Sequence, residues 1–341
     1  MPSQAFVRGL QAIWFGKARP PWVLRLLSPL FGLIVSARQA AFARGLWRSR
    51  RLPKPVVVVG NLTVGGSGKT PLVIWLACQM RDRGFAPGIV LRGYGGSAAR
   101  SDQPLTVQPG SDPALVGDEA LLLRERTGVP VVVGRNRVAA AERLLRIGVD
   151  LIIADDGLQH LRLARDFEIA VIDGARGLGN GYLLPAGPLR EPAQRLASVN
   201  ALVINGERIE LSAGPQQAVF CMRLQGERLF TLTGADAQRP LSSLAAQRVH
   251  AVAGIGNPQR FFDQLTAAGV IVVPHAFPDH HRYRGSDLEF DEPLPLLMTE
   301  KDAVKCRPYA AAERWCLPVT ASFTGMDGSA LLARLQRCLA L

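Results

Sequence analysis

A glycine-rich turn between two apolar segments constrains this chain more than any other feature. The turn lies within VVVVGNLTVGGSGKTPLVIWLA, which covers residues 56–77. The valines at its start predict a buried strand of a parallel sheet, because β-branched residues without polar alternation suit a strand that is covered on both faces. The run from Pro71 predicts a helix, since proline is tolerated in the first turn of a helix. A strand, a glycine turn and a helix in this order are the setting of a phosphate-binding loop.

The loop departs from the common pattern at its entrance. That pattern is G-x-x-x-x-G-K-[ST], and counting back from Gly68 places Thr63 where the first glycine is expected. The glycines that remain let backbone N–H groups converge on phosphate oxygens, and the helix N-terminus adds positive potential. We expect Lys69 to reach the β- and γ-phosphates of ATP and Thr70 to offer its hydroxyl to Mg²⁺. The predicted nucleotide-binding residues are Thr63, Val64, Gly65, Gly66, Ser67, Gly68, Lys69 and Thr70.

A pair of carboxylates supports a nucleotide site. Residues 150–154 predict an apolar strand that ends in Asp155 and Asp156. Enzymes with this loop hold their metal or attacking water at such a strand end, and the carboxyl ends of parallel strands form the ligand-binding edge of the sheet. We therefore expect Asp155 to take part in catalysis and Asp156 to contact Mg²⁺. Without the loop the pair would indicate little, because turns also favour Asp and Gly.

Strand and helix signals alternate along residues 55–205, which predicts an α/β fold: a P-loop NTPase-like parallel sheet with helices on both faces. The strands are expected near residues 56–60, 87–91, 130–133, 150–154, 168–172 and 201–204. A polar stretch at 206–240 is the expected linker, and a second strand–helix alternation follows it. The expected parts are a leader at 1–54, a phosphate-loop domain at 55–215 and a smaller α/β domain at 216–341 that closes a cleft.

The leader at residues 1–54 carries most of the positive charge. The chain has a net charge of +12, and the leader contains no Asp or Glu. Its basic residues are Arg8, Lys17, Arg19, Arg25, Arg38, Arg44, Arg48, Arg50, Arg51 and Lys54. The rest of the chain is close to neutral, so we expect no nucleic-acid partner. The five cysteines are dispersed and no signal peptide is evident, which together favour a reducing compartment and no disulfide framework.

Residues 21–39 of the leader are mostly apolar. On a helical wheel their polar and small residues share one narrow stripe, and large apolar residues cover the rest. The apolar run at 22–35 would give a helix of about 21 Å, against a hydrocarbon core of about 30 Å. We expect residues 1–40 to lie on a membrane surface rich in anionic lipid. The alternative is a helix that packs its apolar face on the protein's own core.

Six sequence blocks together resemble the tetraacyldisaccharide 4'-kinase family of lipid A biosynthesis. In chain order they are GNLTVGGSGKTP (60–71), VGDEA (116–120), DDGLQH (155–160), NGYLLPAGPLREP (180–192), FPDHHRY (277–283) and MTEKDAVK (298–305). The blocks span nearly all of the chain, and the threonine at the loop entrance belongs to the family pattern.

The resemblance implies an enzyme that uses ATP and Mg²⁺ to phosphorylate the 4'-hydroxyl of an acylated glucosamine disaccharide 1-phosphate. It implies association with the cytoplasmic face of the inner membrane, as a peripheral or monotopic protein. It also implies Asp118 as the catalytic base with His280 as its partner across the cleft. Glu119 would lie near Mg²⁺, and Arg190 would stabilise the transferred phosphoryl group. Which of His280 and His281 faces the cleft stays open.

Two other functions fit parts of the sequence. A membrane-associated P-loop ATPase switch would share the loop, the strand-end aspartates and the leader, and a membrane tether with a degenerate nucleotide fold would share the same features. A GTPase is disfavoured, because TEKD at 299–302 does not match the guanine-reading pattern N-K-x-D. Both rivals leave the VGDEA and FPDHHRY blocks without a role.

Single histidines and arginines indicate less. We expect His250 and His275 to be structural, because they lie within or beside an apolar strand. His160 could be structural or could contact the site. Arg92 and Arg137 follow turns near the expected ligand edge, where they could stabilise phosphate charge or form surface ion pairs.

Overall fold

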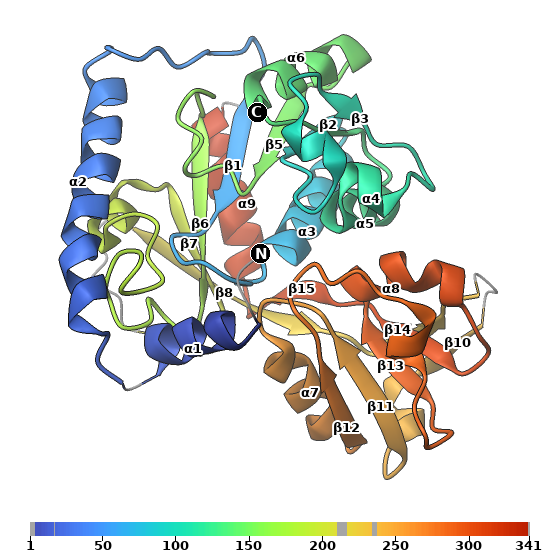
Figure 1. The fold of residues 1–341 in the computed structure, drawn as a ribbon. Helices are drawn as coiled ribbons and strands as arrows, with labels where there is room; N and C mark the ends of the chain where they lie inside the picture. The colour runs from blue at the N-terminus through green and yellow to red at the C-terminus, as the bar shows by residue number, and fades with distance from the viewer. Residues whose placement is uncertain (1–3, 17, 210–216, 234–236, 340–341) are drawn as a thin grey trace.

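The computed structural model describes residues 4–16, 18–209, 217–233 and 237–339. Two β-sheets form its framework, and the chain begins with two helices, α1 (Gln4–Phe15) and α2 (Trp22–Ala43). Figure 1 shows α2 running beside the larger sheet. The smaller sheet lies past the N-terminal end of α1, the end that is not joined to α2.

The larger sheet has nine strands in the order β15-β8-β7-β6-β1-β5-β2-β4-β3. The strands are β1 (Val56–Gly60), β2 (Pro87–Leu91), β3 (Leu105–Thr106), β4 (Val131–Val133), β5 (Leu151–Asp155), β6 (Phe167–Asp173), β7 (Ala201–Asn205), β8 (Ala218–Gln225) and β15 (Thr320–Phe323). All pairs from β8 to β4 are parallel, and the two edge strands are antiparallel. The expected strands are therefore present and parallel.

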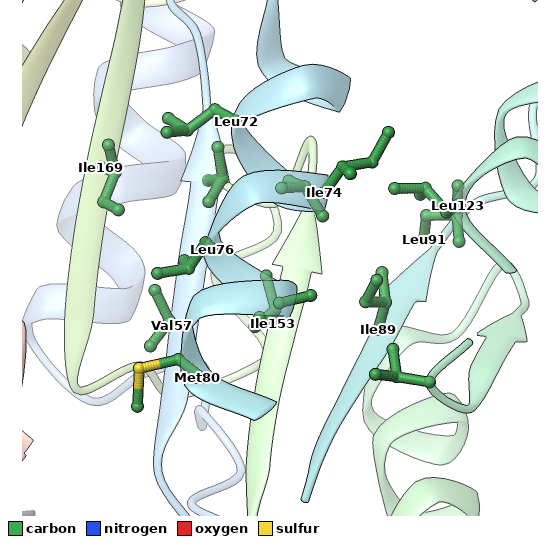
Figure 2. Close-up of a cluster of buried hydrophobic side chains, with 14 of the residues drawn as sticks. Val57, Leu72, Ile74, Leu76, Met80, Ile89, Leu91, Leu123, Ile153 and Ile169 are labelled. Atoms are coloured by element: carbon green, nitrogen blue, oxygen red, sulfur yellow. The ribbon is translucent and has the colours of Figure 1, made fainter. Parts of the chain in front are cut away.

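Helices cover both faces of this sheet, which confirms the predicted fold class. They are α3 (Lys69–Arg81), α4 (Pro113–Val116), α5 (Asp118–Thr127), α6 (Arg137–Ile147) and α9 (Asp327–Leu339). On one face, Leu72, Leu76 and Met80 of α3 pack against Val57 and Ile153 of the central strands (Figure 2). On the other face, α6 and the alternate side chains of the same strands form a second core. The central strand β1 is buried at every position, as a run of valines requires.

The smaller sheet has six strands in the order β10-β9-β14-β13-β11-β12. They are β9 (Arg228–Thr231), β10 (Gln238–Pro240), β11 (Arg248–Ala253), β12 (Ile271–Ala276), β13 (Leu296–Thr299) and β14 (Arg314–Leu317). Helix α7 (Pro258–Ala267) packs on one face, and α8 (Glu300–Cys306) packs on the other. In the described part of the chain, short 3₁₀ helices also lie at Ser97–Arg100, Ala193–Ser198, Leu241–Leu244, Gly285–Leu288 and Arg307–Tyr309.

The chain crosses between the sheets more often than we predicted. The expected linker at 206–240 contains three strands, of which β8 belongs to the larger sheet and β9 and β10 to the smaller one; residues 210–216 and 234–236 lie outside the described chain. The segment CLPVTASF (316–323) contributes to β14 and to β15, one in each sheet. The C-terminal helix α9 packs on the larger sheet. We therefore propose that the smaller unit spans residues 228–317 instead of 216–341.

Helix α2 carries its apolar face outward. Its buried residues are Ser28 and Gly32, which contact Leu183: Ser28 Oγ donates a hydrogen bond of 2.9 Å to the Leu183 carbonyl. The apolar side chains point to solvent, with Trp22 70% and Leu33 67% exposed. The helix thus docks on the protein by its small and polar stripe, and not by its apolar face. By length and composition α2 could also cross a membrane, since its 22 residues give roughly 33 Å.

The buried face of α3 yields a stability prediction. Leu76 is fully buried against the central strands, so Leu76→Ala should lower the free energy of unfolding by about 2–5 kcal/mol through lost contacts and the cavity left behind. Urea denaturation followed by circular dichroism measures this difference. Leu115→Ala is the matched control, because Leu115 is 44% exposed and should change the unfolding free energy little. Equal losses in the two variants would contradict the packing described here.

Candidate active site

The phosphate loop joins β1 to α3 at the carboxyl edge of the larger sheet. Gly65 and Gly68 have φ of 110° and 91°, a region that side chains other than glycine rarely adopt. A Cβ on Gly68 would also lie 2.3 Å from Asn205 Nδ2, which holds the loop by donating to the Ser67 carbonyl at 3.1 Å. No side chain caps the N-terminus of α3, so its first N–H groups can bind phosphate oxygens.

The unusual entrance of the loop has a structural explanation. Thr63 forms an antiparallel bridge with Leu189, and the next residue, Val64, donates its N–H to the Pro188 carbonyl at 2.8 Å. The backbone at Thr63 does not have a positive φ. A glycine is therefore not required at this position, and the bridge fixes the loop against the NGYLLPAGPLREP block.

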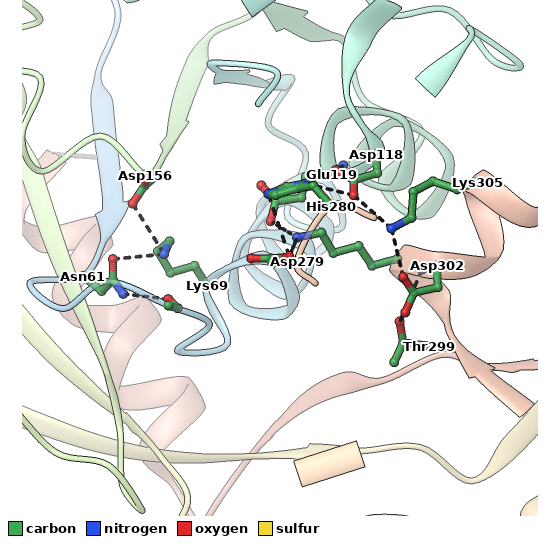
Figure 3. Close-up of polar contacts among 12 residues, drawn as sticks. Asn61, Lys69, Asp118, Glu119, Asp156, Asp279, His280, Thr299, Asp302 and Lys305 are labelled. Atoms are coloured by element: carbon green, nitrogen blue, oxygen red, sulfur yellow. Dashed lines mark hydrogen bonds and ion pairs between the residues drawn. The ribbon is translucent and has the colours of Figure 1, made fainter. Parts of the chain in front are cut away.

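Lys69 lies in a small polar network at the base of the loop (Figure 3). Its Nζ donates to Asn61 Oδ1 at 3.0 Å and lies 3.4 Å from Asp156 Oδ1. Arg190 Nη1 contacts both carboxylate oxygens of Asp156 at 3.1 Å. Burial would raise the pKa of Asp156, but the charges of Lys69 and Arg190 lower it to about 2. The structure thus brings together three predicted residues and adds Asn61, which no spacing rule identified.

Asp155 lies beside this network in a different electrostatic environment. It is 2% exposed, and its Oδ1 has no hydrogen-bond donor among the described residues. Burial and the nearby charges of Glu119 and Asp156 raise the pKa of Asp155 to about 7. A buried carboxylate oxygen without a donor, next to two further carboxylates, favours a bound cation.

These residues fit a magnesium ion. Within the described ranges no group of three or more His, Cys, Asp or Glu side chains forms a preassembled metal site. Mg²⁺ needs none, because it typically takes one or two carboxylates and completes its shell with water and substrate phosphates. Thr70 and Glu119 line the same cavity as Asp155 and Asp156. The oxygen of Asp155 that lacks a donor makes it a stronger candidate than the sequence suggested, since Asp156 is already paired with two cations.

The Asp118 carboxylate meets an imidazole from the other unit. Asp118 starts α5, and His280 Nδ1 lies 3.0 Å and 3.1 Å from its two oxygens. Burial would raise the pKa of Asp118, but the hydrogen bond from His280 and the nearby lysine charges lower it to about 2. Burial would lower the pKa of His280, but the hydrogen bond to Asp118 raises it. The lowered pKa of Asp118 and the raised pKa of His280 both favour an ion pair between the two side chains.

His280 and His281 differ in the groups that their side chains contact. The backbone of His280 has φ of 59°, and its ring lines the cavity beside Tyr94. His281 Nε2 instead contacts Asp287 Oδ2 at 3.1 Å, and its ring packs against Phe277. His280 is therefore the histidine that faces the cleft in this arrangement.

Two lysines of the MTEKDAVK block also reach this region, and the sequence analysis gave them no role. Lys301 Nζ contacts Glu119 Oε1 at 3.0 Å and Asp279 Oδ1 at 2.9 Å. Burial would lower the pKa of Lys301, but Glu119 and Asp279 raise it well above its usual value. Lys305 contacts Asp118 from the far side. Only the fold brings these cations from α8 to α5, so no local pattern could have found them.

The remaining candidate residues fall into two groups by their position relative to the large cavity. His250 and His275 contact each other at 3.0 Å on the smaller sheet, and neither lines the large cavity. His160 does line it, together with Arg92 and Arg137. Burial and nearby arginines, Arg137 foremost, lower the pKa of His160 to about 4, so its ring is neutral at neutral pH.

One cavity of about 1660 Å³ connects the phosphate loop with His280. The phosphate loop, Asp155, Asp156 and Arg190 line it from the larger sheet, while His280 and Lys301 line it from the smaller unit. Its size exceeds that of a typical small-molecule pocket, which is at most about 1,000 Å³. The space is therefore sufficient for a nucleotide together with a second large substrate.

Comparisons with known proteins agree with this geometry. The sequence model of the family described as tetraacyldisaccharide-1-P 4'-kinase matches residues 20–339. A tetraacyldisaccharide 4'-kinase from Methylobacillus flagellatus is 47% identical, with 98% of each chain covered. Another from an Azoarcus species is 50% identical, with 94% of each chain covered. The crystal structure of the "apo" form of LpxK from Aquifex aeolicus in complex with ATP superposes with a TM-score of 0.76 at 30% identity, covering 92% of this chain and 97% of that one. This chain therefore belongs to the tetraacyldisaccharide-1-phosphate 4'-kinase family, as its six sequence blocks predicted.

Proposed function

We propose that this protein transfers the γ-phosphoryl group of ATP to the 4'-hydroxyl of a tetraacylated glucosamine disaccharide 1-phosphate, which yields a lipid IVA-type precursor of lipid A. Family membership makes it an ATP-dependent kinase of lipid A biosynthesis. One structural observation supports the proposal: a single cavity is lined by the phosphate loop at one side and at the other by His280, whose ring contacts Asp118 behind it. The two reactants of a phosphoryl transfer would meet between them.

The phosphate side of the cavity binds and orients the nucleotide. Backbone N–H groups at the start of α3 would cradle the phosphates, and Lys69 would contact the β- and γ-phosphate oxygens. Arg190 would stabilise charge on the transferred group. The proposed Mg²⁺ ligands are Thr70, Glu119 and Asp156, and the buried Asp155 oxygen without a donor supports Asp155 as a further ligand. A bound ion would neutralise charge on the phosphate oxygens.

The opposite side activates the sugar hydroxyl. We propose Asp118 as the base that accepts the hydroxyl proton and His280 as the partner that orients its carboxylate. The low pKa of Asp118 makes it a weak base. A weak base suffices, because the transition state of phosphoryl transfer is loose and the hydroxyl proton moves late. The two groups come from different units, so the pair depends on how the units sit together.

The position of the lipid follows from α2. A glycolipid substrate implies membrane association, and the exposed apolar face of α2 could insert beside the lipid. The leader's basic residues would contact anionic headgroups. The cytoplasmic face of the inner membrane is the side where ATP is available, and we propose this location.

A lipid-dependent assay tests the proposed function. Purified protein is incubated with [γ-³²P]ATP and either detergent alone or a membrane lipid extract. We expect label to enter a glycolipid and ADP to form only when the extract is present. Equal ADP formation without lipid, and no labelled glycolipid, would instead favour the ATPase switch.

The lysine of the phosphate loop gives the first activity prediction. Lys69→Ala should lower turnover by about 10²–10³, because a preorganised charge on the phosphates is lost. Arg190 still pairs with Asp156, so the variant should fold, which its thermal melting curve checks. Lys54→Ala is a basic control outside the cavity and should be active. Normal turnover in a folded Lys69→Ala protein would rule out the nucleotide assignment.

The Asp118–His280 pair gives the second activity prediction. Asp118→Asn and His280→Ala should each lower kcat more than they weaken ATP binding, and the double variant should be little worse than the poorer single one, because the pair acts as a unit. His281→Ala is the matched control, since His281 contacts Asp287 instead. Steady-state kinetics of the wild-type protein, the two single variants and the double variant measure this double-mutant cycle. Strictly multiplicative losses would give the two residues separate roles.

The exposed face of α2 gives a membrane prediction. Leu26 and Leu33 are each 67% exposed, so replacing both with glutamate should leave the fold intact and abolish sedimentation with anionic liposomes. Point substitution is the sharper test than deletion of residues 1–40, because α1 and α2 also hydrogen-bond the 180–189 segment. Ile147→Glu, an exposed apolar position on α6, is the control. Full liposome binding by the α2 variant would contradict the anchor.

A further inference from the structure

Lys305 contacts the proposed base from the side opposite its histidine. Its Nζ lies 3.6 Å from Asp118 Oδ2 and 2.9 Å from Asp302 Oδ1, and Figure 3 shows Asp118 between His280 and Lys305. His280 lines the cavity, whereas Asp118 and Lys305 do not. The carboxylate is thus enclosed by an imidazole in front and an ammonium group behind.

Asp302 fixes the lysine in this position. It is fully buried, and its Oδ2 accepts hydrogen bonds from Thr299 Oγ1 at 2.6 Å and from the Gly254 N–H at 2.9 Å. Lys305 follows three residues later, on the same side of α8, which aligns its side chain with Asp302. The ammonium group also lies over the ring of Tyr283, with Nζ 5.1 Å from the ring centroid. Few other directions are open to it.

The same aspartate anchors the turn that faces the phosphate loop. Gly254 begins this turn, and two residues later Gly256 lies so close to the loop that a Cβ on it would be 2.6 Å from Gly66 N. Arg176 Nη1 donates to the Gly256 carbonyl at 3.2 Å from the larger unit. One Asp302 oxygen therefore holds Gly254, at the start of the turn that approaches the phosphate loop, and the other contacts Lys305, which contacts the proposed base.

Stability alone does not explain these charges. A buried ion pair seldom adds net stability over apolar residues of similar size, because the cost of desolvating both charges offsets their attraction. Lys305 and Asp302 are nearly or fully buried where α8 meets α5. The other lysine of α8, Lys301, contacts Glu119 and Asp279 instead, and Lys305 contacts Asp118.

We propose that Lys305 is a positioning residue of the phosphoryl transfer, which holds the Asp118 carboxylate in register with His280 while Asp302 holds Lys305. Without the lysine the carboxylate can turn away from the imidazole, and the pair loses its geometry. The inference rests on the proposed function of Asp118 and His280. The proposed roles of the phosphate loop and of the Asp118–His280 pair do not involve the MTEKDAVK block, and this inference gives that block a role.

A variant that keeps the length of the side chain tests the role. Lys305→Met should lower kcat by about 10- to 100-fold, the loss expected from misplacing a catalytic group, and should leave KM for ATP unchanged. Combined with Asp118→Asn it should cause no further loss, because its effect passes through Asp118. Lys305→Arg, which keeps the charge, should recover part of kcat. Arg307→Met is the matched control: it removes an ion pair to Glu125 between the same parts of the chain, away from Asp118, and should keep kcat.

The outcomes separate the inference from the proposed function. Wild-type kcat in a folded Lys305→Met protein, or a further loss in the Asp118→Asn background, overturns the role of Lys305. Wild-type kcat in Asp118→Asn itself overturns the proposed base instead. If Lys305→Met does not fold because Asp302 is left unpaired, the Asp302→Asn/Lys305→Met protein removes both charges. That protein should show the same loss of kcat, and wild-type turnover in it would overturn the inference.

Discussion

The burial of β1 at the centre of the larger sheet is the constraint on which the rest of the structure depends. Its valines are covered by helices on both faces, so the strand must end at the sheet's carboxyl edge, where its backbone turns into α3. The phosphate loop is that turn. Because β5 is its parallel neighbour, Asp155 and Asp156 reach the same edge. The nucleotide site is therefore a consequence of sheet order, and the glycines only make the turn possible.

The second requirement of the site is a balance of charge across two units. On the phosphate side, Lys69 and Arg190 neutralise Asp156, while Asp155 stays without a donor. On the other side, the acidic start of α5 is matched by His280 and by two lysines of α8. On this second side the carboxylates of Asp118 and Glu119 belong to the larger unit, and the cations that pair with them belong to the smaller unit. Residues proposed to act on the substrate thus also contribute to the interface between the units.

Helix α2 inverts the usual rule for amphipathic helices. In a soluble protein the apolar stripe of a helix faces the core. Here Ser28 and Gly32 face the protein, and the large apolar side chains of α2 face outward. The small residues allow close approach to Leu183, in the block that also pairs with the entrance of the phosphate loop. The helix with the exposed apolar face and the phosphate loop are therefore braced by one segment.

The sequence by itself determined the elements whose cause is local. Glycine spacing, the valines of β1 and the strand-end aspartates predicted the phosphate loop and the parallel sheet, because backbone conformation and burial on both faces depend on neighbouring residues. Tertiary structure alone decided which distant residues meet. The return of β15 to the larger sheet, the choice of His280 over His281, and the arrival of Lys305 behind Asp118 leave no periodic signal. Contacts between residues far apart in the chain depend on how the sheets pack, and no short pattern encodes that packing.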